Sequence, residues 1–307
     1  TILLFSFVGA SIAQKHYKEL EYPELRDIKV PKVEQATLSN GIKLFLLEDR
    51  ELPLIELSAR IRTGSIYEPA DKIGLAAITG EVMRTGGTKT KTGDEIDEEL
   101  ERIAAEVETS IGEDAGYARM SVLKKDIDTG LNILADVLMN PEFREEKIEL
   151  SKVQHRSGIA RRNDNVQQIA YREFAKLIYG AESPYARHPE YETIDNITRD
   201  DLIEFHKKYY HPNNVIMGVW GDFDAKTMKK KIEEAFKDWK KVELNIPPVP
   251  EVDYEFKPTV NLIKKEDVNQ TNIIMGHIGG RYDNPDYHAL VLTNRILGGL
   301  PFTSRLF

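Results

Sequence analysis

The sequence predicts an α+β fold with a mostly antiparallel sheet, and three observations support this prediction. Strand and helix patterns occur in runs, without the strict alternation of strand and helix that builds parallel sheets. An Asn40-Gly41 pair precedes the apolar run 42–47, which is a hairpin signal. The chain has 307 residues, about the length of one full domain and part of another.

The expected domain organisation follows from a change in composition near residue 245. Residues 245–251 (NIPPVPE) are rich in proline, which is typical of an interdomain linker. We therefore predict a first domain over 33–244, a linker over 245–256 and the start of a second, homologous domain over 257–307. A core of this kind needs more than roughly 55 residues, so we expect the second unit to be incomplete.

The early elements have distinct signals. Segment 54–62 alternates apolar and polar residues, which predicts a half-buried strand. Residues 74–84 contain no turn signal and predict a helix. The capping box Thr92-x-x-Glu95 predicts the start of a further helix, whose apolar stripe has helical spacing. That stripe comprises Ile96, Leu100, Ile103 and Val107.

The later elements complete the first domain and begin the second. A helix with an apolar stripe from Ile127 to Leu138 is expected to end before Pro141. Thr198-x-x-Asp201 caps a helix that runs to Tyr210. The remaining predicted elements are strands at 117–123, 215–220, 259–264 and 272–278, and helices at 143–162, after Asp224 and at 286–297.

Composition excludes several classes of function. The net charge of −9 repels phosphate backbones, so we expect no nucleic-acid partner. The chain has no cysteine, which excludes disulfides, cysteine-ligated metals and a thiol nucleophile. Beyond the N-terminal segment, no apolar run approaches the ~20 residues of a membrane-spanning helix, so we expect no membrane span.

The N-terminal segment has features of a secretory signal peptide. Residues 2–10 (ILLFSFVGA) are apolar and uncharged, and Ser11-Ile12-Ala13 supplies the small residues of a cleavage site. We therefore predict that residues 1–13 are part of a signal peptide and that the protein is exported to the periplasm or the exterior. The alternative is that this run is a buried strand.

The usual catalytic arrangements are missing from the sequence. There is no P-loop, no Gly-x-Gly-x-x-Gly and no Gly-x-Ser-x-Gly motif. A helical zinc site needs histidines four residues apart, and none of the seven histidines has this spacing; His206 and His211 differ by five. The acidic residues of 94–101 read as a solvated helix face, with calcium binding as the alternative.

Several segments in order over about residues 33–307 resemble the pitrilysin/insulinase family of zinc peptidases, particularly its mitochondrial-processing branch. No single segment is decisive, and their order and spacing make the resemblance specific. The segments are Leu38-Ser39-Asn40-Gly41, Arg62-Thr63-Gly64-Ser65, Gly74-Leu75-Ala76, Gly86-Gly87-Thr88, Tyr209-Tyr210-His211-Pro212-Asn213-Asn214, Gly221-Asp222-Phe223, Asp286-Tyr287, Ile296-Leu297-Gly298-Gly299 and Phe302-Thr303-Ser304-Arg305-Leu306.

The resemblance implies where the family's zinc site would lie in this chain. Active members carry His-x-x-Glu-His after the counterpart of Gly74-Leu75-Ala76, and a third ligand, a Glu, roughly seventy-five residues later. The two histidine positions fall on Ala77 and Glu81, the general base falls on Gly80, and the distant Glu falls on Gly158. Alanine and glycine have no donor atoms, so we predict no catalytic residue, no metal ligand set and no zinc cofactor.

The resemblance also implies a fold and a function. It implies tandem α+β domains, each a curved, mostly antiparallel sheet backed by helices and facing a peptide-holding chamber. In some members of the family a degenerate chain pairs with an active one. We therefore predict a non-catalytic subunit whose partner bears His-x-x-Glu-His, with peptides as substrates of the pair. The alternatives are a scaffold protein without a role in proteolysis and an active zinc metalloendopeptidase with unrecognised ligands.

The signal-peptide interpretation makes a direct prediction. We expect the mature protein from its native host to begin at Gln14, because Ser11-x-Ala13 places small residues where signal peptidase cleaves. N-terminal sequencing of the purified mature chain measures this. A mature cytoplasmic chain that retains residues 2–10 would show that the apolar run is not a signal peptide.

Overall fold

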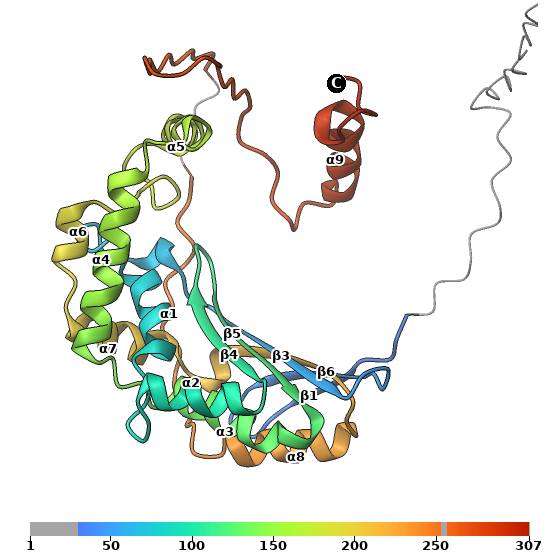
Figure 1. The fold of residues 1–307 in the computed structure, drawn as a ribbon. Coiled ribbons are helices and arrows are strands. Elements are labelled where there is room, and N and C mark those ends of the chain that lie inside the picture. The colour runs from blue at the N-terminus through green and yellow to red at the C-terminus, as the bar shows by residue number, and fades with distance from the viewer. Residues whose placement is uncertain (1–29, 253–256, 307) are drawn as a thin grey trace, which may run out of the picture. The chain divides into compact units, whose positions relative to one another are not determined.

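The computed structural model describes residues 30–252 and 257–306 (Figure 1). The predicted signal segment and part of the predicted linker lie outside the described residues. Residues 245–252 form neither helix nor strand. In the described ranges, no helix combines the length and the apolar character that crossing a membrane requires.

One six-stranded sheet forms the centre of the fold, in the order β1-β2-β6-β3-β5-β4 (Figure 1). Only β2 and β6 pair in parallel, and every other neighbouring pair is antiparallel. The prediction of an α+β fold with a mostly antiparallel sheet is confirmed. The strands are β1 Glu34–Thr37, β2 Lys43–Glu48, β3 Leu54–Ile61, β4 Glu106–Ile111, β5 Gly116–Leu123 and β6 Val215–Gly221.

Strand β6 lies between two strands, β2 and β3, whose residues come much earlier in the sequence. Its Val219 is opposite Leu46 on one side and Leu57 on the other. Val215, Met217 and Val219 alternate with more exposed residues and point into the core. The sheet is therefore complete only when a segment from the end of the first predicted domain has been added to it.

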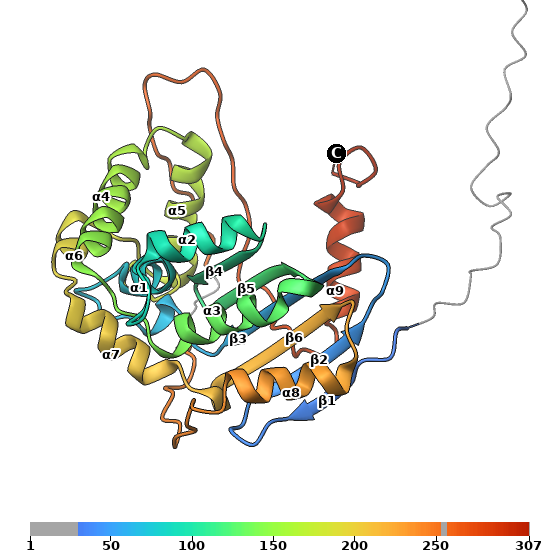
Figure 2. The same ribbon diagram turned by 60° about the horizontal axis from the view of Figure 1, so that its bottom comes forward.

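Helices cover one face of the sheet. Helices α3 and α8 lie side by side across it, and α1 packs against the edge strand β4 (Figure 2). The covered face is apolar, as the buried residues of β3 show: Ile55, Leu57, Ala59 and Ile61. The α-helices are α1 Leu75–Thr85, α2 Gly93–Arg102, α3 Ile127–Met139, α4 Glu145–Arg161, α5 Val166–Tyr179, α6 Tyr191–Asp195, α7 Arg199–Tyr209, α8 Ala225–Ala235 and α9 Tyr287–Asn294.

The boundary between α2 and β4 differs from the prediction. Val107 was expected in the apolar stripe of a helix, whereas α2 ends at Arg102 and Val107 lies in β4. The left-handed backbone of Ala104, with φ of 50°, turns the chain out of the helix. Residues 106–111 then alternate between exposed and buried, so Val107 satisfies both the helical spacing and the strand period.

Two strands predicted in the second unit are absent from the described residues. Segments 259–264 and 272–278 are extended coil, and Val260 and Met275 are 97% and 91% exposed. Neither segment bonds to a neighbouring strand, and an unpaired strand is not stable. The helix predicted at 286–297 is present as α9 with a π-helical turn over Arg295–Gly299.

The predicted helix after Thr198 carries a buried histidine. Thr198 and Asp201 form the expected capping box at the start of α7. His206 Nε2 lies 2.9 Å from the carbonyl oxygen of Leu138, so this nitrogen carries the proton and donates it to the end of α3. Burial lowers the pKa of His206 to about 4, because a charged imidazole would lose its water there.

The buried imidazole predicts a pH dependence of stability. The unfolded state binds a proton below pH 6.5 and the folded state only near pH 4, so the free energy of unfolding should fall as pH falls between these values. At about 1.4 kcal/mol per pKa unit, the loss is about 3 kcal/mol.

Urea unfolding of the wild type and of His206→Gln, at several pH values between 4 and 7.5, measures this contribution. Glutamine keeps a donor for Leu138 but does not titrate, so the stability difference between the two proteins should change with pH. A difference that stays constant over this range would contradict the assignment of a neutral, buried His206.

Candidate functional site

The zinc-site positions implied by the resemblance lie on α1 and α4. Helix α1 begins after Gly74, whose φ of 109° is left-handed and favours glycine. The N-cap residue Gly74 has no side chain to cap the helix, and the carboxylate of Glu68 takes this role. It accepts hydrogen bonds from the amides of Ala76 at 2.6 Å and Gly74 at 3.2 Å. This carboxylate fixes the start of α1.

Glu68 is buried, and burial dominates its ionisation. Desolvation raises the pKa of Glu68 to about 7, although the amides of Ala76 and Gly74 and the charge of Arg187 act in the opposite direction. Both oxygens are occupied by α1 amides, so the carboxyl group is a structural cap.

Gly80, at the family's general-base position, leaves no room for a side chain. A Cβ atom there would lie 2.4 Å from the amide nitrogen of Ile111 and 2.7 Å from the carbonyl carbon of Ser110. Real Cβ atoms do not approach backbone atoms so closely, so α1 touches β4 backbone to backbone at this point. A glutamate at position 80 would require α1 and β4 to move apart.

Two hydrogen bonds hold α1 in this close contact with β4. The Thr109 hydroxyl donates to the carbonyl oxygen of Gly80 at 2.6 Å, and Nε of Arg84 donates to the carbonyl oxygen of Val107 at 2.8 Å. Arg84 is buried and also forms an ion pair with Asp97 at 2.5 Å.

Glu81, at the second histidine position, contacts two residues of α4. The hydroxyl of Ser151 donates to Glu81 Oε2 at 2.7 Å, and His155 Nε2 lies 3.8 Å from the same oxygen. Sequence reasoning missed both residues, although their spacing of four places them on one face of a helix. Ser151 donates to a carboxylate and not to the imidazole, so the histidine does not activate it as a nucleophile.

The remaining positions have no donor atoms to offer. Ala77 is half-buried on α1, and Gly158 is exposed on α4, where an added Cβ would meet nothing within 4 Å. Glu81 and His155 supply one carboxylate and one imidazole, and a zinc site in this family uses three protein donors. In the described part of the chain, no three His, Asp or Glu side chains gather around a metal-sized space. The residues present do not fit zinc.

The structure also places the other residues that the sequence singled out. His206 is partly buried beside Leu138, to which it bonds, while His211 precedes a short 3-10 turn. On α2, Asp94 pairs with Lys147 at 2.8 Å. Asp97 and Glu99 are likewise bound to cations, namely Arg84 and Lys91. Three of the six acidic residues of 94–101 are thus in ion pairs, and Glu95 belongs to the capping box of α2.

Comparison with known proteins identifies the class of protein. Residues 49–183 match the family model described as insulinase, peptidase family M16, and residues 196–307 match the model described as peptidase M16 inactive domain. The two matches together cover most of the chain. The chain belongs to the M16, or insulinase, family of peptidases, as the sequence resemblance predicted.

Among curated proteins, the chain is 26% identical over 280 residues to an uncharacterized zinc protease of Rickettsia felis, with 89% of this chain and 65% of that protein aligned. It is 26% identical over 280 residues to the uncharacterized zinc protease YmxG of Bacillus subtilis, with 90% and 66% aligned. In Dictyostelium discoideum, mitochondrial-processing peptidase subunit beta is 24% identical over 211 residues, covering 67% of this chain and 44% of that one. The chain thus spans about two thirds or less of these relatives.

Solved structures share the fold. A peptidase M16 inactive domain from Pseudomonas fluorescens superposes with a TM-score of 0.74 at 24% identity, over 90% of this chain and 66% of that one. The periplasmic protease PqqL from Escherichia coli superposes with a TM-score of 0.65 at 19% identity, over 72% and 25% of the chains. The M16 fold is therefore shown for this chain.

The packing of Gly80 predicts opposite effects for two alanine substitutions. Gly80→Ala should lower the free energy of unfolding by about 2 kcal/mol or more, because its methyl group overlaps the β4 backbone. Gly158→Ala should raise it by about 0.5–1 kcal/mol, because this helix position is open and alanine is the better helix former.

Chemical denaturation of the two variants and the wild type tests this pair. The second variant is the matched control, since it makes the same chemical change at another family zinc-site position. Equal stability of Gly80→Ala and wild type would show that α1 and β4 are not in backbone contact.

Proposed function

We propose that this chain is a non-catalytic M16 subunit that pairs with an active His-x-x-Glu-His homologue and forms with it a chamber for peptide degradation or processing. The observation that carries the proposal is Gly80. Its position is the family's general base, and here it lies against β4 where no side chain fits. The fold is kept, while the family's catalytic positions serve packing.

The edge of the sheet supports a role in peptide binding. Strand β4 ends the sheet, and only β5 pairs with it. The turn bond from Gly112 N to Ala115 O sets the register, so Val107, Thr109 and Ile111 direct their backbone groups away from β5. Nε of Arg84 already donates to one of these groups, the carbonyl oxygen of Val107. Extended peptides bind to exposed strand edges through backbone hydrogen bonds.

The relatives support pairing. The chain is similar to proteins named as subunits of mitochondrial-processing peptidase, including subunit beta and, at 28% identity over 195 residues, subunit alpha-1 of Dictyostelium discoideum. Their names describe parts of a larger enzyme. A chain without a zinc ligand set contributes to proteolysis only through another chain that has one, so pairing is what a role in proteolysis requires.

Two other functions remain to be distinguished from this one. A scaffold protein would assemble without changing peptide hydrolysis by its partner. An active zinc peptidase would hold metal through ligands outside the described residues. Export, supported by the apolar run 2–10 and Ser11-x-Ala13, is part of the proposal and sets the compartment in which the partner is sought.

We expect the full-length protein to have no peptidase activity alone and to form a stable heterodimer with the active homologue from the same organism. Adding it should raise hydrolysis of a fluorogenic peptide by that homologue more than tenfold, about 1.4 kcal/mol of barrier. Light scattering after size exclusion measures the complex, and the peptide assay measures the rate.

The controls separate the three functions. The Gly158→Ala variant, which alters only an exposed helix position, should activate the partner as the wild type does. Co-elution without a change in rate would identify a scaffold, and failure to co-elute would remove the partner hypothesis. One zinc per isolated chain by elemental analysis, together with hydrolysis by that chain, would identify an active peptidase.

A further inference from the structure

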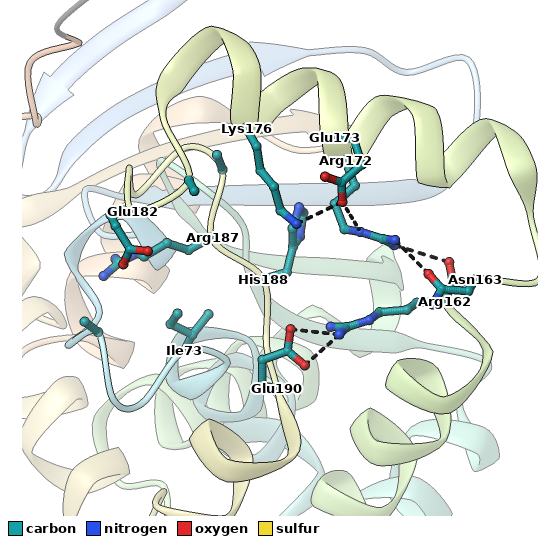
Figure 3. A pocket seen from close by; sticks show the side chains of 13 residues that line it. Ile73, Arg162, Asn163, Arg172, Glu173, Lys176, Glu182, Arg187, His188 and Glu190 are labelled. Atoms are coloured by element: carbon teal, nitrogen blue, oxygen red, sulfur yellow. Dashed lines mark hydrogen bonds and ion pairs between the residues drawn. The ribbon is translucent and has the colours of Figure 1, made fainter. Parts of the chain in front are cut away.

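A second site lies on the far side of the α1 N-terminus from the family zinc positions. A cavity of about 470 Å³ is formed by α5, the end of α4, the segment 181–190 and residues just before α1 (Figure 3). This volume is within the range of small-ligand sites. Its wall contains four cationic side chains and three carboxylates. They are Arg162, Arg172, Lys176 and Arg187, with Glu173, Glu182 and Glu190.

Most of these charges are paired. A single nitrogen of Arg162, Nη2, donates to both carboxylate oxygens of Glu190, at 2.8 and 2.6 Å. Lys176 bonds to Glu173 at 2.8 Å, and Nε of Arg172 lies 3.5 Å from the same oxygen of Glu173 (Figure 3). Four cations against three carboxylates leave the wall with one net positive charge when His188 is neutral.

Arg187 is a cation of this wall without an ion pair to any described residue. One NH2 group of Arg187 donates to the backbone carbonyl oxygen of Glu68 at 3.1 Å, which does not neutralise the charge. The charge of Arg187 favours the ionised form of Glu68 and so lowers its pKa, but the two side chains form no ion pair, and the Glu68 oxygens accept from the amides of Gly74 and Ala76. The charge of Arg187 is therefore available to a ligand.

Two buried polar atoms of adjacent residues in this wall lack partners. Within the described part of the chain, Nε of Arg187 and Nε2 of His188 are inaccessible to solvent and form no hydrogen bond. Buried nitrogen atoms of this kind are bonded in the great majority of folded proteins, and a bound ligand is one way in which such an atom acquires its partner. Both residues line the same cavity.

The surroundings of His188 favour an anion over a cation. Desolvation and the charges of Arg172, Lys176 and Arg162 lower the pKa of His188, and Glu173 only partly offsets them. The potential that these three cations create at the imidazole attracts negative charge into the cavity. An anion bound there would relieve the same repulsion.

We propose that this cavity binds a carboxylate group of a peptide, with Arg187 supplying the unpaired charge and with Arg187 and His188 supplying the donors that lack partners. A carboxylate carries one negative charge, which balances the single net positive charge of the wall. Guanidinium groups bind carboxylates through directed hydrogen bonds that are strengthened by charge. The carboxylate can come from the C-terminus of the peptide or from an acidic side chain.

The inference takes its ligand class from the proposed function, since a chamber for peptides would hold them at more than one point. The cavity is formed entirely by this chain, so its test needs no partner subunit. Failure of the cavity to bind peptides would leave the heterodimer test unaffected, and failure to form a heterodimer would leave this test unaffected.

The test is fluorescence anisotropy with the isolated full-length protein and three tetrapeptides, each labelled at the N-terminus with an uncharged dye that has no carboxylate. One is tetra-alanine with a free C-terminal carboxylate, one is its C-terminal amide, and one is an amide with a central glutamate. We expect the free acid or the glutamate peptide, whichever source is correct, to bind at least tenfold more tightly than the alanine amide.

Variants locate the site. Arg187→Gln and His188→Gln should each weaken binding at least tenfold, while Arg187→Lys, which keeps the charge, should lose less. Arg60→Gln is the matched control, because Arg60 is an exposed arginine of β3 that pairs with Asp114, and it should bind as the wild type does. Thermal unfolding by circular dichroism establishes that each variant is folded.

Several results would overturn the proposal. Equal affinity for all three peptides, or no binding at millimolar concentration, would exclude a carboxylate site. Unchanged binding by folded Arg187→Gln and His188→Gln would place the ligand elsewhere. If Arg187→Gln does not fold, the imidazole NMR signals of His188 in the wild type decide: they must shift when the binding peptide is added and stay fixed with the alanine amide.

Discussion

The backbone contact between α1 and β4 at Gly80 constrains most of the first domain. A helix that touches a strand this closely must have glycine at the point of contact, and its direction is then fixed by the neighbouring bonds from Thr109 and Arg84. Because β4 is the edge strand, the same contact places α1 beside the end of the sheet. Position 80, which the resemblance aligns with the family's general base, is thereby a packing position in this chain.

Sequence periodicity predicted the elements whose burial follows one simple pattern. Strand β3 alternates cleanly, and α7 has its capping box, so both were expected where they occur. Val107 fits both the helical spacing of the stripe before it and the two-residue period of β4. The chain leaves the helix at Ala104, whose φ is positive, and Val107 therefore lies in the strand. Helix α5 was missed although Asn165 caps it through the amides of Gln167 and Gln168, because a lone asparagine also begins many turns.

The candidate sites were predictable only in part. The absent donors at Ala77, Gly80 and Gly158 follow from the resemblance, since chemistry at those positions depends on residue type. The contact of Ser151 with Glu81 joins residues 70 apart in sequence, and no local pattern indicates it. The cavity wall is similar, because α5 and the segment 181–190 meet there and no local sequence pattern indicated either part.

The contact between Glu81 and Ser151 joins α1 to α4 directly through protein side chains. In the family's arrangement, ligands on the counterparts of α1 and α4 bind one zinc ion, which would join the two helices. Here a carboxylate on α1 and a buried hydroxyl on α4 are joined directly, and neither helix depends on an ion. A hydrogen bond to a charged group contributes about 1.5–3 kcal/mol, less than a structural zinc ion, but it needs no deprotonated histidines or metal supply. The Gly80 contact adds packing on the other side of α1. The backbone contact at Gly80 and the hydrogen bond at Glu81 together fix α1 between β4 and α4.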